Sequence, residues 1–85
     1  MNAYTLLPHD MTDLSVSIMP CHNPHHGHAN PQILTLRFTW RGAQIVIESE
    51  EGSGRFNVRI GDVTALQLTE HAARMFLYEQ MEARP

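Results

Sequence analysis

Apolar and polar residues alternate from Leu34 to Ile60 in a way that predicts three paired β-strands. A period of two places successive side chains on opposite faces of a strand. Arg41-Gly42 fits a two-residue hairpin turn, and Gly52-Ser53 fits a second one. Together the two turns set a register that gathers the apolar residues on one face of the sheet. We therefore expect an antiparallel meander of strands over residues 33–40, 43–50 and 55–60.

The predicted register makes specific cross-strand pairs. Phe38 lies opposite Ile45 on the apolar face, and Glu50 lies opposite Arg55 on the polar face. An opposite-charge pair of this kind contributes about 0.2–1 kcal/mol. Trp40 falls on the apolar face at the end of its strand, so we expect it to be only partly covered.

Further elements flank the meander. Residues 14–18 alternate strictly and predict another strand, which Pro20 ends. Residues 63–68 fit either a short strand or the first turns of a helix, and we favour the strand because Thr69 is a suitable helix N-cap. From Glu70 to Ala83 the chain lacks glycine, proline and β-branched residues, and its apolar residues recur at helical spacing. The predicted class is α+β, an antiparallel β-meander of four to five strands with one C-terminal α-helix, residues 69–83, packed on its apolar face.

The length of 85 residues fits one small domain, residues 1–85, with an N-terminal extension over residues 1–12. One cysteine cannot form an internal disulfide, and no segment approaches the roughly 18 apolar residues of a membrane span, so we expect a cytoplasmic protein with no membrane contact. So small a core favours a homodimer. Two surfaces could form the dimer interface: an apolar surface around Met75, Tyr78 and Met81, and a free strand edge at 14–19 or 63–68.

A polar segment over residues 20–32, here called the Cys/His loop, holds a cluster of metal-ligating residue types. Its candidate ligands are Cys21, His22, His25, His26 and His28. Thiolate and imidazole suit zinc, nickel or copper. Structural zinc sites usually draw ligands from two separate elements, however, so a solvated loop that binds metal only adventitiously is the competing interpretation. The same histidines would make the protein sensitive to pH, because protonation of all six in the chain moves its formal charge from −3 to +3.

The polar face of the meander carries a second candidate site. Arg37, Arg55 and Arg59 surround Val46 there, and arginine recognises carboxylate or phosphate through bidentate hydrogen bonds. A solvated face with cross-strand ion pairs would explain the same pattern. The isoelectric point of about 6.0 argues against nucleic acid as the ligand, because nucleic-acid-binding domains are usually basic.

No catalytic set is assembled in the pattern. Cys21 stands beside His22, but neighbours on an extended segment point to opposite sides and do not form a nucleophile and base. We therefore expect no enzyme. The sequence predicts a small non-catalytic protein-binding module, a regulator, adaptor or inhibitor of a protein partner, of a size common among phage and mobile-element proteins. The alternative is a protein that binds or senses a divalent metal through the Cys/His loop.

Overall fold

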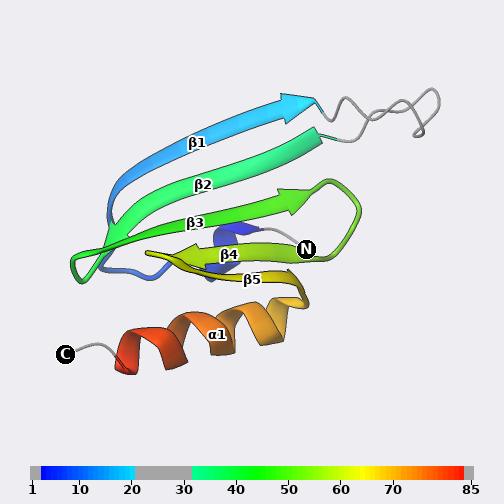
Figure 1. Ribbon diagram of the computed structural model, residues 1–85. Helices are drawn as coiled ribbons and strands as arrows, with labels where there is room; N and C mark the ends of the chain where they lie inside the picture. Colours follow the sequence, from blue (N-terminus) through cyan, green and yellow to red (C-terminus); the bar gives the residue numbers. More distant parts are fainter. Residues whose placement is uncertain (1–2, 21–31, 84–85) are drawn as a thin grey trace.

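A computed structural model describes residues 3–20 and 32–83 of the chain (Figure 1). A five-stranded antiparallel sheet runs in the order β1-β2-β3-β4-β5, and one α-helix packs against β4 and β5, so the predicted α+β meander is confirmed. In chain order the elements are η1 (Ala3–Leu6), β1 (Thr12–Pro20), β2 (Gln32–Trp40), β3 (Ala43–Glu50), β4 (Phe56–Ile60), β5 (Val63–Leu68) and α1 (Glu70–Glu82). Within the described part of the chain, no helix is long and apolar enough to cross a membrane.

The register of the three central strands is the predicted one. Phe38 pairs with Ile45, and Ile45 pairs with Ile60 on its other side. The first turn has the expected form, because Arg41 and Gly42 both have positive φ, at 52° and 80°. Positive φ at both central residues matches the twist of the strands that such a turn joins. Alternation and turn chemistry together were therefore sufficient to predict this hairpin.

The second turn differs from its prediction. The Ser53 backbone N–H donates to the Glu50 carbonyl at 3.1 Å, which centres the turn one residue earlier than Gly52-Ser53. The Ser53 hydroxyl also accepts from the Arg55 N–H at 3.1 Å and holds that residue in the turn, ahead of β4. The predicted pair of Glu50 with Arg55 is therefore wrong: no cross-strand pairing joins the two residues, and no ion pair between them occurs in the described structure.

The core lies between the inner face of the sheet and α1. Phe38, Ile45 and Val58 are almost fully buried there, as the apolar pattern predicted. The helix contributes Ala73, Leu77 and Met81 to the same cluster. Burial of Met81 corrects the expectation that it extends an exposed apolar surface. That surface is reduced to residues such as Met75 and Tyr78, which are 45% and 47% exposed.

Trp40 is buried rather than partly covered, with 1% of its surface exposed. The Tyr78 ring meets its ring edge-on, with centroids 5.4 Å apart, and the Arg41 guanidinium lies 5.0 Å from the ring centroid. The indole N–H donates to Asp10 Oδ1 at 2.8 Å, so the buried donor is satisfied. This hydrogen bond, together with the nearby Arg41 charge, lowers the pKa of the Asp10 carboxyl below its usual value.

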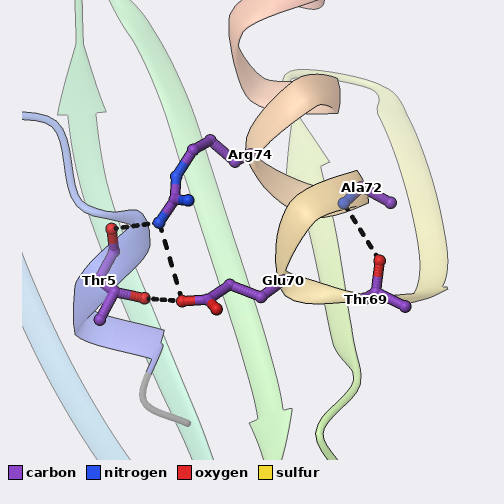
Figure 2. A network of polar contacts seen from close by, with 5 residues as sticks. All are labelled: Thr5, Thr69, Glu70, Ala72 and Arg74. Atoms are coloured by element: carbon purple, nitrogen blue, oxygen red, sulfur yellow. Dashed lines mark hydrogen bonds and ion pairs between the residues drawn. The ribbon is translucent and has the colours of Figure 1, made fainter.

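The N-terminal segment is part of the folded domain. Ala3 and Leu6 of η1 are buried in the core, although the alternation predicted no element before residue 12. Figure 2 shows how η1 is tied to the first turn of α1. The Thr5 hydroxyl donates to Glu70 Oε1 at 2.5 Å, and Arg74 Nη2 donates to the Thr5 carbonyl at 3.3 Å. Residues 65 positions or more apart in the chain are thus joined by polar contacts.

The segment before α1 is a strand, which confirms the preferred interpretation of residues 63–68. Thr69 is the helix N-cap, and its hydroxyl accepts from the Ala72 backbone N–H at 3.2 Å (Figure 2). Just before it, Gln67 adopts a positive φ of 59° where the β4–β5 register shifts. This irregularity interrupts the regular strand pairing, which resumes only at Leu68 opposite Phe56 before the helix begins.

Candidate functional site

The outer face of the sheet, opposite α1, carries the predicted arginine site. Arg37 on β2 pairs with Val46 on β3, and Val46 pairs with Arg59 on β4. The row continues to Ser15 on β1 and Thr64 on β5. Side chains directly opposite one another in a sheet have Cβ atoms about 4.5–5.5 Å apart. The register therefore places an arginine on each side of one valine.

A second row of polar residues runs beside the first. Thr35 pairs with Glu48, and Glu48 pairs with Asn57. The Asn57 side chain donates to Glu48 Oε1 at 3.4 Å and accepts from the Gln67 N–H at 2.9 Å. Asn57 thereby connects the carboxylate on β3 to the irregular end of β5. These contacts restrain Glu48 at one side of the arginine row.

The two rows enclose a shallow hollow of about 270 Å³. Val46 is half-buried in it, while Leu66 at the β5 edge is 65% exposed and forms an apolar side. The hollow, called here the outer-face hollow, is lined by Thr35, Arg37, Val46, Glu48, Asn57, Val58, Arg59, Thr64 and Leu66. Short side chains between two long arginines leave this space open.

Arg37 and Arg59 are exposed, and within residues 3–20 and 32–83 neither guanidinium takes part in an ion pair. The ion pairs of the described chain involve Arg41 and Arg74, which lie elsewhere. A guanidinium presents five N–H donors in a planar fork that fits a carboxylate. The outer-face hollow therefore offers two free cationic groups beside an apolar floor.

Arg55 does not share this hollow, although the sequence placed it in the same set. It lies in the turn before β4 and lines a separate hollow of about 70 Å³ together with Glu48 and Glu50. Arg55 precedes Arg59 by four residues, about 13 Å of extended chain, so it lies beyond the row of Thr35, Glu48 and Asn57. The candidate site is therefore reduced to Arg37, Arg59 and Val46.

A larger hollow, of about 560 Å³, lies on the inner face and was not predicted. Ile18 and Leu34, a cross-strand pair, and Tyr4 of η1 line it, with Glu50 and Glu51 also in its wall. Its existence depends on where η1 packs against the sheet. Residues 3–6 carry no periodic pattern that indicates this packing, so the hollow could not be predicted from the sequence.

The candidate metal ligands Cys21, His22, His25, His26 and His28 lie outside the described residues. In the part of the chain that the structure describes, no group of three or more histidine, cysteine, aspartate or glutamate side chains is placed to hold a metal ion. The metal hypothesis therefore stays a prediction from the sequence.

The fold and the outer-face hollow define a small α+β domain with an arginine-bearing sheet surface. Comparison of the chain with protein-family models, with curated proteins and with solved structures finds no match.

Proposed function

We propose that the protein is a non-catalytic protein-binding module that regulates, adapts or inhibits a partner by holding an acidic segment of it against the outer-face hollow. The observation that carries the proposal is the row Arg37–Val46–Arg59, in which two guanidinium groups that form no ion pair with any described residue flank an apolar floor. A complementary ligand would place an apolar side chain on Val46 and a carboxylate on each of the two flanking guanidinium groups. We place this action in the cytoplasm.

The dimensions of the hollow favour a side chain or two of a protein over a whole small molecule. Its volume of about 270 Å³ lies below the usual size of small-molecule pockets, about 300–1,000 Å³. Leu66 is exposed at its edge and extends the apolar contact outward. A peptide segment can place one apolar side chain on Val46 and its carboxylates on the arginines, while the rest of the partner covers Leu66.

Protein is favoured over nucleic acid by charge and by the position of the aromatic residues. The chain has a formal net charge of −3, which repels a polyanion at long range. Single-stranded nucleic acid is usually held by aromatic side chains that stack on its bases. The described aromatics lie in η1, in α1 or on the inner face of the sheet, and therefore away from the outer-face hollow.

Selection of displayed random peptides on the immobilised protein tests the proposal. We expect enriched peptides to carry two or more carboxylates around an apolar residue. The double variant Arg37→Gln/Arg59→Gln should weaken their binding at least tenfold, because a hydrogen bond to a charged group contributes about 1.5–3 kcal/mol. Arg55→Gln is the matched control for each single variant, Arg37→Gln and Arg59→Gln, since it removes one charge from the same side of the sheet but outside the hollow.

Two results would contradict the proposal. Enriched peptides without acidic residues would show that the arginines do not select the ligand. Equal loss of binding in Arg55→Gln and in each single variant, Arg37→Gln or Arg59→Gln, would show that net charge, and not the hollow, controls binding. The same variants, applied to a full-length partner purified from the source cells, then determine whether the natural complex uses this surface.

A further inference from the structure

The free edge of β1 carries exposed apolar side chains and no charged one from Leu14 to Met19. Among the described strands β1 pairs with β2 alone, and Figure 1 shows it at the side of the sheet away from α1. Leu14, Val16 and Ile18 alternate along it and are 40%, 44% and 59% exposed. An edge strand presents backbone N–H and C=O groups that are ready to pair with another strand.

The sequence of this edge is self-complementary. Leu14-Ser15-Val16-Ser17-Ile18 has the same apolar and polar pattern in both directions. A two-fold axis through Val16 would set Val16 opposite Val16 of a second copy, and Leu14 opposite the second copy's Ile18. An isologous interface requires this kind of self-matching, because the same patch is used by both subunits. We propose that two copies of this chain pair antiparallel through β1, in the register centred on Val16, to form one continuous ten-stranded sheet.

Charge favours the same pairing. Residues 14–20 carry no ionisable group, and the charged residue of β1, Asp13, would lie opposite Met19 of the second copy. No like charges therefore face each other across the axis. Natural edge strands are usually protected from such pairing by charged side chains or by bulges. The protective features of β1 lie at its two ends: a register shift between Thr12 and Ser15, with a positive φ of 58° at Asp13, and Pro20. Between them, residues 15–19 pair with β2 in continuous register and carry no charge.

The other edge of the sheet is a poorer site for self-pairing. Both edge strands contain a register shift and a residue of positive φ, Asp13 in β1 and Gln67 in β5. On β5 the shift leaves only residues 63–65 in continuous pairing, whereas on β1 residues 15–20 pair without interruption. A bulge increases the local twist and disrupts the hydrogen-bonding row that a second strand needs. α1 also packs beside β5, whereas no α-helix packs against β1 in the described structure. We therefore expect the second copy to pair through its own β1 and not through its β5.

The buried area indicates a weak dimer. Leu14, Val16, Ile18 and Met19 expose an area on the order of 350 Å² per copy, so with the serines and the backbone the interface covers on the order of 1,000 Å² in total, the lower limit for specific complexes. We expect a dissociation constant of about 1–100 μM, as is usual for interfaces of this size class. This pairing uses a different surface from the outer-face hollow and does not depend on the proposed function.

Sedimentation velocity over a range of concentrations tests the pairing. The wild-type chain of 9.7 kDa should double in mass as its concentration rises through the micromolar range. Val16→Lys should raise the dissociation constant at least about tenfold, because it places two ammonium groups opposite each other. Leu66→Lys on β5, at a more exposed position, should dimerise as the wild type does. A wild-type chain that is monomeric at about 500 μM, or a dimer that Leu66→Lys disrupts and Val16→Lys does not, would overturn the proposal.

Disulfide trapping reads the register directly and does not depend on the charged variant. In a Cys21→Ser background, Val16→Cys should form a covalent dimer with itself in a glutathione redox buffer. Leu14→Cys and Ile18→Cys should each stay monomeric alone, because four residues separate the two thiols by about 13 Å. Mixed together, these two variants should form a covalent heterodimer. Self-linking at position 14 or 18, or no trapping at any position, would refute the register centred on Val16.

Discussion

Truncation of Leu77 tests whether α1 covers the inner face of the sheet. Leu77 is 1% exposed and packs in the central cluster from the middle of the helix. The change Leu77→Ala removes three carbon atoms, which corresponds to about 2.4 kcal/mol of lost burial at about 0.8 kcal/mol for each. A partly collapsed cavity adds to this loss, so we expect the free energy of unfolding to fall by about 3 kcal/mol.

That loss is large for a chain of 85 residues, whose total stability should lie near 4–13 kcal/mol, or about 0.05–0.15 kcal/mol per residue. It corresponds to a decrease in melting temperature of about 12–24 °C. Urea unfolding followed by the fluorescence of Trp40, the single and buried tryptophan, measures it. The protein is kept at low micromolar concentration so that association does not contribute.

Glu79→Ala supplies the control, since Glu79 is exposed on the same helix and its loss should change stability by less than about 0.5 kcal/mol. The two variants should differ in unfolding midpoint and share the wild-type dependence on urea. A loss below about 1 kcal/mol for Leu77→Ala would refute the packing of α1 on the sheet, because an exposed leucine would give that result.

The remaining predictions concern pH and metal. The pKa of Asp10 is lowered in the folded chain, chiefly by the hydrogen bond from Trp40, so its contribution to stability is present above its unfolded value of about 3.8 and is lost as the pH falls through the lower folded value. Asp10→Asn should therefore flatten the melting profile below about pH 5 and leave its shape between about pH 5 and pH 7 unchanged, while Asp62→Asn, at an exposed turn, should follow the wild type. For the Cys/His loop, a physiological metal site predicts at least one bound equivalent of zinc, nickel or copper in protein purified without a histidine tag, and a lower melting temperature after chelation. Less than about 0.2 equivalents, with an unchanged melting temperature, would discard that alternative.

The elements that the sequence predicted well depend on interactions between near neighbours. Phe38 and Ile45 are joined by a hairpin whose two-residue turn and apolar alternation allow one register only. Thr69 starts α1 through a hydrogen bond to a residue three positions away. Three of the four residues of the predicted arginine site followed for the same reason, because Arg37 and Arg59 each lie opposite Val46 once the register is known.

Contacts between segments that are distant in the chain could not be predicted from the sequence. The turn before β4 is a local exception: the Ser53 hydroxyl accepts from the Arg55 N–H and keeps that residue out of the strand. Trp40 contacts Tyr78, Asp10 and Arg41, which come from different parts of the chain. The spacing of apolar residues in the sequence does not indicate that these side chains come together.

The sequence alone determined the strands, their order along the meander and the helix, since period, turn residues and caps act within a few residues. The tertiary structure decided which residues are buried and which surfaces stay exposed to a partner. It packed η1 into the core and brought Arg37 and Arg59, but not Arg55, to one hollow. It also left the apolar residues of β1 exposed at the sheet edge away from α1. One helix is too small to cover all five strands of the sheet. Only the folded chain shows that α1 lies over β4 and β5 and leaves β1 uncovered.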